Sequence, residues 1–76
     1  MANYAFSANT STDVISWIVE PFDVSGTQSV LKCNVSSDVL SWDATKPNGA
    51  TERFLHCDSA TDVISWKDPD SYTWTV

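Results

Sequence analysis

Three copies of a short motif with acidic, hydroxyl and aromatic side chains recur in this chain of 76 residues. The sequence Asp-Val-(Ile/Leu)-Ser-Trp occupies residues 13–17, 38–42 and 62–66. A carboxylate and a hydroxyl group bind hydroxyl groups, and an indole ring packs against an apolar C–H surface. A sugar ring offers both kinds of surface, so each copy of the motif predicts a shallow monosaccharide site.

A further polar residue precedes each motif at constant spacing. Asn9, Asn34 and Asp58 lie four positions before the aspartates of the three motifs. Side chains of this type either bind a ligand beside the motif or satisfy the backbone of a turn. The predicted ligand-binding residues are these three with the aspartates and tryptophans: Asp13, Trp17, Asn9, Asp38, Trp42, Asn34, Asp62, Trp66 and Asp58.

The motifs belong to a longer internal repeat. Offsets of 25 and then 24 residues also align apolar or small residues upstream, namely Phe6 with Leu31 and Leu55, and Ala8 with Cys33 and Cys57. We therefore predict one domain over residues 1–76, made of three repeats at about 1–26, 27–50 and 51–76. In organisation, though not in a matched signature, the pattern resembles the tryptophan-bearing repeats of small multivalent lectins.

Each repeat contains two candidate strands that must position the motif. Both are rich in β-branched and aromatic residues, and a short Ser/Thr/Asn/Asp stretch typical of a hairpin turn separates them. We predict an all-β protein of about six strands, with three β-hairpins around a pseudo-threefold axis, closed as a β-prism or a short barrel with trefoil-like symmetry. The final residues, 72–76, are expected to pair near the start of the chain, and 18–28 to form the longest loop.

Strand alternation leaves two interpretations of the motif open. Asp13, Ile15 and Trp17 share one face of a strand, and Val14 and Ser16 share the other. In the structural interpretation, the first face is the core in all three copies, and each aspartate caps the preceding turn. In the functional interpretation, the tryptophans are only partly buried and present an indole face to a ligand.

The cysteines and the single histidine suggest no catalytic or metal site. Cys33 and Cys57 occupy equivalent positions in two repeats, so we expect them to lie within cross-linking distance but to remain reduced. His56 precedes Cys57 and should point to the opposite face, where we expect it to be exposed. The spacing matches neither a zinc site nor an EF-hand calcium loop, so no metal or other cofactor is predicted.

The charge balance limits the classes of partner. Ten acidic residues against four basic ones give a formal net charge of −6, which repels the phosphate backbone of nucleic acids. No apolar run approaches the ~20 residues of a membrane-spanning helix, so no membrane insertion is predicted. The first residues lack the features of a secretory signal, and we expect a cytoplasmic location or leaderless secretion.

The sequence thus predicts a small multivalent carbohydrate-binding protein that has no enzymatic activity and whose partners are glycans. The alternative is a protein-binding module, such as a protease inhibitor that presents the 18–28 segment with Pro21 and Phe22 as anchors. A structural subunit that forms homo-oligomers through its acidic surface is also left open.

Overall fold

Three antiparallel hairpins form the larger of two β-sheets in the computed structural model, which describes residues 2–24 and 26–75. The hairpins pair β1 (Asn3–Asn9) with β2 (Val14–Val19), β4 (Gln28–Asn34) with β5 (Leu40–Asp43), and β6 (Glu52–Asp58) with β7 (Val63–Lys67). The smaller sheet pairs β3 (Phe22–Asp23) in parallel with β8 (Trp74–Thr75), which follows a 3-10 turn, η1 (Pro69–Ser71). The prediction of an all-β protein is confirmed.

The three hairpin turns use the same local chemistry. The Oδ1 atom of the residue that ends the first strand accepts a backbone N–H two positions later, at 2.9 Å in all three turns. The last turn residue has a positive φ of 57–59° in every copy, at Asp13, Asp38 and Asp62. Aspartate tolerates this left-handed region better than most residues. The repeated polar residues therefore build three similar turns.

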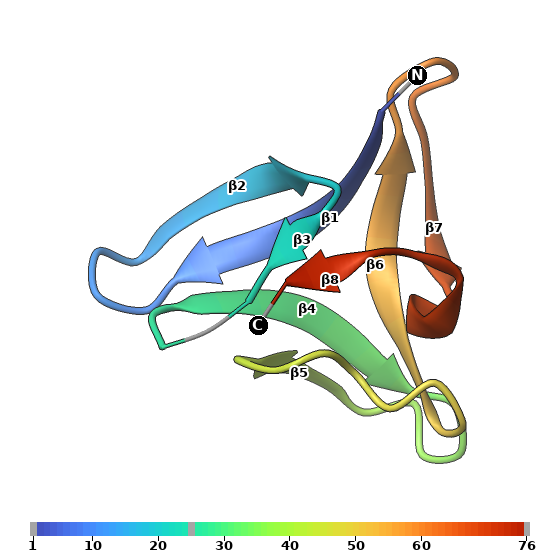
Figure 1. Ribbon diagram of the computed structural model, residues 1–76. Coiled ribbons are helices and arrows are strands. Elements are labelled where there is room, and N and C mark those ends of the chain that lie inside the picture. Colours follow the sequence, from blue (N-terminus) through green and yellow to red (C-terminus); the bar gives the residue numbers. More distant parts are fainter. Residues whose placement is uncertain (1, 25, 76) are drawn as a thin grey trace.

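The first strands of the hairpins, β1, β4 and β6, each pair with both of the other two. The pairing runs head to tail: the end of β1 pairs with the start of β4, the end of β4 with the start of β6, and the end of β6 with the start of β1. In Figure 1 these strands run along the sides of a triangle, with the hairpin turns at its corners. The described strands form no closed barrel, and the predicted threefold β-prism stays a prediction.

The core lies on one face of this triangle and takes four of its eight residues from the segments that follow the first and third hairpins. Its buried members are Ala5, Phe22, Val24, Val30 and Phe54, with Ile18, Tyr72 and Trp74 packed against them. The ring centroid of Phe22 lies 5.3 Å from that of Phe54 and 4.8 Å from that of Trp74. β3 and β8 therefore cover this face, in front of the triangle in Figure 1.

Two expectations about these joining segments were wrong. The 18–28 segment is not one loop, because it contains the end of β2 and all of β3. The C-terminal strand β8 pairs with β3 and not with the start of the chain, where β1 pairs with β6 instead. The physical reason is that Phe22 and Trp74 bury their rings together over the core face. Residue 76 lies outside the described residues.

His56 was expected to be exposed, and this expectation was also wrong. It alternates with Phe54 along β6 and faces the core, where only 3% of its surface is exposed. Its Nε2 atom lies 3.0 Å from Oδ1 of Asn3, whereas Nδ1 is buried without a hydrogen-bond partner in the described part of the chain. Burial lowers the pKa of His56 below its ordinary value, because the charged imidazolium loses its solvation.

Candidate functional site

The repeated tryptophans lie on the side of the strands opposite the core. Trp17 is paired with Phe6, Trp42 with Leu31 and Trp66 with Leu55, positions that alternate with the core-facing residues of the inner strands. Their exposed fractions are 37%, 42% and 39%. The tryptophans are therefore only partly buried, and the interpretation that places them in the core is wrong.

These tryptophans form part of a wider apolar surface, which we call the tryptophan face. It consists of Trp17, Trp42 and Trp66, their cross-strand partners Phe6, Leu31 and Leu55, and the exposed residues Ile15, Leu40 and Ile64. Phe6 links two hairpins, because its ring centroid lies 4.8 Å from that of Trp17 and 5.9 Å from that of Trp42. At about 250 Å² per full side chain, the indoles alone expose roughly 300 Å².

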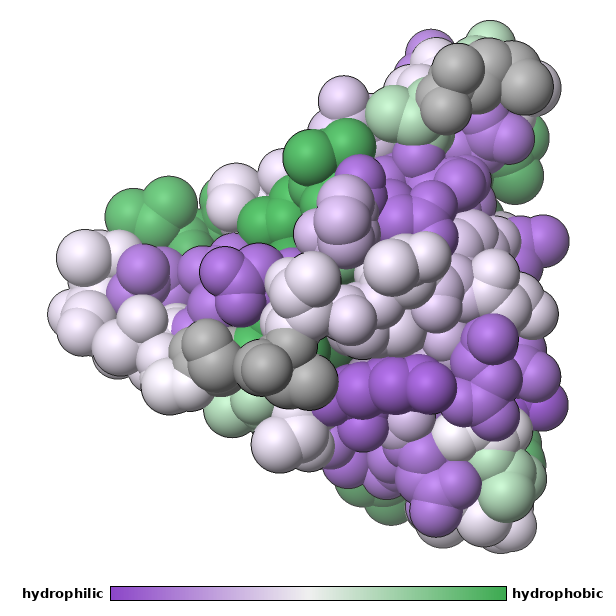
Figure 2. Space-filling view, in the orientation of Figure 1, coloured by the Kyte–Doolittle hydropathy of each residue, from purple (hydrophilic) through white to green (hydrophobic). Residues whose placement is uncertain are grey.

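The exposed area of the indoles alone is already comparable with the largest apolar patch on an ordinary monomer. The largest patch on an ordinary monomer measures about 300–600 Å² and is often functional. Figure 2 views the molecule from the side of β3 and β8, where hydrophilic and intermediate colours dominate and hydrophobic atoms appear mainly along the edges. The two sides of the strands therefore differ in what they offer to a partner.

Two shallow hollows on the tryptophan face combine residues of neighbouring hairpins. One, of about 270 Å³, is lined by Ala8, Asn9, Thr10, Asp13, Ile15 and Trp42. The other has the same volume and is lined by Tyr4, Trp17, Cys57, Ser59 and Asp62. The structure thus brings Asp13 together with Trp42, and Asp62 together with Trp17. The aspartate and the tryptophan of one motif do not share a hollow.

The third junction, between the second and third hairpins, differs from the other two in charge. Pairing along the triangle places Arg53 opposite Cys33, where the other two junctions have Ser29 opposite Ala8 and Tyr4 opposite Cys57. The Nη1 atom of Arg53 donates hydrogen bonds to the carbonyl oxygens of Gly49 and Glu52, at 2.9 and 2.8 Å. The order of the hairpins around the triangle assigns Asp38 and Trp66 to this junction. Arg53 gives it a positively charged side chain that the other two junctions lack.

The predicted polar residues divide into two roles. Oδ1 of Asn9, Asn34 or Asp58 accepts the N–H groups of its own turn, so these residues stabilise the hairpins. In the described part of the chain, the carboxylates of Asp13, Asp38 and Asp62 form no hydrogen bond. The interpretation in which these aspartates cap the turns is therefore wrong. Their carboxylates remain available at the corners of the triangle.

The two cysteines do not lie within cross-linking distance, contrary to expectation. Cys33 is opposite Arg53, and Cys57 follows four residues further along β6, about 13 Å at 3.3 Å per residue. A disulfide requires Cα atoms within about 7 Å. Both thiols are free, and each donates to the carbonyl oxygen of the following residue, at 3.7 and 3.9 Å.

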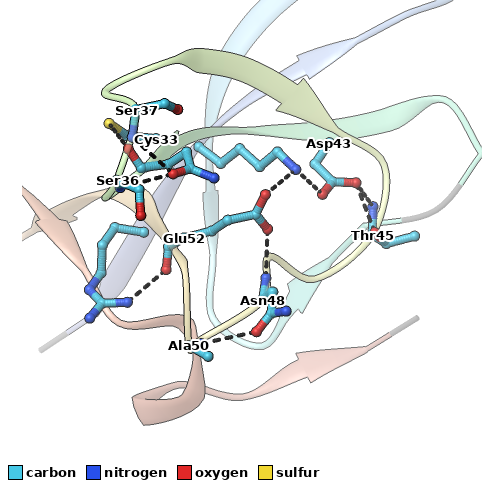
Figure 3. A network of polar contacts seen from close by, with 11 residues as sticks. Cys33, Ser36, Ser37, Asp43, Thr45, Asn48, Ala50 and Glu52 are labelled. Carbon is cyan, nitrogen blue, oxygen red and sulfur yellow. Dashed lines mark hydrogen bonds and ion pairs between the residues drawn. The ribbon is translucent and has the colours of Figure 1, made fainter.

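A cluster of charged residues joins β4, β5 and β6 (Figure 3). Nζ of Lys32 lies 2.8 Å from Oδ2 of Asp43 and 2.6 Å from Oε2 of Glu52, whose Oε1 accepts the N–H of Asn48. These bonds raise the pKa of Lys32, the bond to Asp43 most. Partial burial acts to raise the pKa of Asp43, but its bonds with Lys32 and Thr45 outweigh this and lower it. The bond from Lys32 lowers the pKa of Glu52. The cluster is satisfied internally and holds strands together.

Comparisons with known proteins add no further candidate site: no family model matches the chain, and neither does any curated protein or solved structure. Within the described residues, no three His, Cys, Asp or Glu side chains are placed to hold a metal ion. No helix in residues 2–24 or 26–75 is long and apolar enough to cross a membrane.

A larger hollow of about 540 Å³ lies outside the tryptophan face, lined by Ile18, Val19, Pro21, Asp23, Thr27 and Gln28. It contains no tryptophan and no residue of the predicted ligand-binding set. The tryptophan face, which brings those residues together, is therefore the main candidate site.

Proposed function

We propose that the protein is a small multivalent lectin that binds carbohydrate at the hairpin junctions of the tryptophan face. The observation that carries this proposal is the pairing of an exposed indole with an available carboxylate in both hollows, Trp42 with Asp13 and Trp17 with Asp62. A pyranose ring can pack its axial C–H groups on the indole while its hydroxyl groups donate to the carboxylate. The protein binds the sugar and does not transform it.

The proposal assigns one site to each junction, with Trp66 and Asp38 at the third. It includes the pseudo-threefold relation of the hairpins, which gives each site one indole and one carboxylate, with Arg53 added at the third. Each hollow is small and open, so the affinity for a monosaccharide should be weak, on the order of millimolar. Simultaneous binding to a glycan-bearing surface would increase the apparent affinity by about 10²–10⁴ where the spacing of the sugars permits.

The alternative of a loop-presenting inhibitor is not favoured by the position of its proposed anchor. Phe22 is fully buried between Phe54 and Trp74, so it cannot enter the cleft of a partner enzyme. Pro21 is exposed, but alone it provides little apolar area. We therefore retain carbohydrate binding as the proposed function.

A glycan array followed by sugar titrations monitored by tryptophan fluorescence tests the proposal. Asp13→Asn removes the charge but introduces a residue that also tolerates positive φ. Trp42→Ala removes the indole ring of the same hollow. We expect each change to weaken one site at least about tenfold, and the double variant to lose little more, because both residues serve one site. Asp23→Asn, outside the tryptophan face, is the matched control.

A double variant with both changes in one motif should behave in the opposite way. Asp13→Asn and Trp17→Ala affect two different hollows, so their effects on total binding should add. If no glycan binds or changes the fluorescence of the wild-type protein, carbohydrate binding is wrong. If the effects of Asp13→Asn and Trp17→Ala fail to add while those of Asp13→Asn and Trp42→Ala do, the sites lie within single motifs and not at the junctions.

A further inference from the structure

The outer strand of each hairpin leaves one backbone edge unpaired. Among the described strands, β2 pairs only with β1, β5 only with β4, and β7 only with β6. Unpaired edges of this kind bind further strands unless charges, prolines or bulges prevent it. The three edges can be compared position by position, because the hairpins are repeats of one another.

The free backbone groups of β2 follow from its hydrogen bonds with β1. The N–H of Glu20 donates to the carbonyl oxygen of Asn3 at 2.9 Å, and alternate residues of β2 bond to β1 in the same way. The N–H and C=O groups of Ile15, Trp17 and Val19 therefore point away from the hairpin. They form an uninterrupted row of donors and acceptors along six residues of strand.

Only one of the three edges lacks a charged residue within its strand. The repeat offsets align Ile18 and Val19 of β2 with Asp43 and Ala44, and with Lys67 and Asp68. β5 therefore ends in an acid and β7 in a base, whereas all six residues of β2 are uncharged. Ile18 packs against the core, but Val19 remains 50% exposed, so core packing does not account for it.

The acidic residue that follows β2 is directed into the molecule. Glu20 accepts a hydrogen bond from Nδ2 of Asn3 at 3.0 Å and another from the N–H of Thr73 at 2.7 Å. Its carboxylate is therefore engaged within the chain and adds no repulsion along the edge. In Figure 2, hydrophobic atoms gather along the edge of the arm that contains β1 and β2.

We propose that two copies of the chain dimerise by antiparallel pairing of their β2 strands. In the register that places Trp17 opposite Trp17 of the second copy, Ile15 faces Val19, and every outward N–H meets an outward carbonyl. A second copy fits this edge because β2 is its own complement in this register and none of its six residues is charged, so the repulsion between copies with a net charge of −6 is weakest at this contact. This inference is independent of carbohydrate binding.

Strand pairing of this kind determines how the two tryptophan faces are oriented. The twofold axis of two antiparallel strands in one sheet is perpendicular to that sheet. Both tryptophan faces therefore point to the same side of the dimer, with the two Trp17 side chains adjacent at its centre. The dimer presents one continuous apolar surface that is twice as wide as that of the single chain.

Sedimentation velocity over about 10 μM to 1 mM protein, the range suited to a small interface, tests the proposal. Wild-type protein should shift from monomer to dimer. Ile15→Pro removes an outward N–H and no hydrogen bond to β1, so it should weaken dimerisation at least about tenfold. Ile64→Pro is the matched control, because Ile64 holds the same position in β7 and has the same exposure of 55%.

A second pair of variants covers the case in which proline disturbs the hairpin. Ser16→Lys adds a charge to the edge strand and should also weaken the dimer, whereas Ser65→Lys, its equivalent in β7, should not. Circular dichroism and tryptophan fluorescence confirm that each variant is folded. The proposal is overturned if wild-type protein stays monomeric, if the β2 and β7 variants of a pair weaken dimerisation equally, or if Ile15→Pro and Ser16→Lys leave it unchanged.

Discussion

The two sides of the triangular sheet divide the apolar residues in an unexpected way. The buried side holds two phenylalanines, two valines and one alanine, whereas the open side displays three tryptophans with their aliphatic neighbours. The difference arises from what covers each side. β3 and β8, from segments outside the repeat pattern, lie only over the core. The three hairpins therefore build the frame of the protein, and the segments outside them complete its core.

The largest expected effect contrasts one residue from each side of the same hairpin. Phe54→Ala should lower the free energy of unfolding by about 3–5 kcal/mol, because it leaves a cavity against Phe22 and Trp74. Trp66→Ala should cost less, about 2 kcal/mol, because 39% of this residue's surface stays exposed and its removal leaves no enclosed cavity. Urea unfolding of both variants measures the difference. Equal losses would mean that the tryptophan face is covered in solution.

The dependence of stability on pH near neutrality tests the core side, because His56 is buried there. Burial lowers the pKa of His56 from its ordinary 6.5, so below pH 6.5 the unfolded chain binds a proton that the folded chain does not. The free energy of unfolding should therefore be highest above 6.5 and fall as the pH decreases further. His56→Gln should flatten this decrease. A wild-type protein equally stable at about pH 7.5 and pH 5 would contradict the buried position of the ring.

The carboxylates beside Lys32 act in a separate pH range. Asp43 and Glu52 have pKa values lowered from 3.8 and 4.5, so their stabilisation is present above these values and is lost only in more acidic solution. The decrease assigned to His56 begins at higher pH. The two contributions can therefore be separated in one titration.

A smaller effect is expected for the charged cluster at the edge of the core side. Lys32→Met should cost about 1–2 kcal/mol, because Asp43 and Glu52 lose their shared cation in a partly buried position. Lys46→Met is the control, because its ion pair with Asp70 is largely exposed and should contribute less than about 0.5 kcal/mol. Unfolding in low and high salt compares the two. A larger loss for Lys46→Met would reverse the assignment.

The smallest expected effect lies at a corner of the tryptophan face. Asp38 has a φ of 58°, which glycine adopts without strain and alanine does not. Asp38→Gly should change stability by less than about 0.5 kcal/mol, whereas Asp38→Ala should cost about 1 kcal/mol. Thermal unfolding of both variants decides this. A strong loss with glycine would show that the carboxylate itself stabilises the turn.

The hairpins and their turns could be predicted from sequence because their causes are local. Strand alternation and the spacing from Asn9 to Asp13 depend on neighbouring residues, and the structure shows the corresponding turns. Which face of the hairpins becomes the core could not be predicted. Alternation divides the side chains between two faces but does not say which face is buried. Phe22 and Trp74 decide it from outside the repeat, and the burial of His56 follows.

The residues that line each hollow could not be predicted, because they come from hairpins that are far apart in the sequence. Asp13 and Trp17 are close in sequence, but Trp42 reaches the hollow of Asp13 only because β4 follows β1 around the triangle. Repeat spacing alone is consistent with sites inside one hairpin or between two. The sequence motif groups Asp13 with Trp17, whereas the structure places Asp13 beside Trp42 and Asp62 beside Trp17.

The pairing of β6 with β1 has a consequence for how the chain acquires its structure during synthesis. Asn3 pairs with Asp58, so the third side of the triangle joins strands that are far apart in the sequence. A ribosome that has released only the first 50 residues has supplied β1 and β4 but not β6, and half of each inner edge lacks its partner. Because pairing this remote requires an entropically costly loop closure, the final assembly comes late and involves the whole chain. Chains truncated before residue 58 should therefore be targets for proteolysis and not stable fragments.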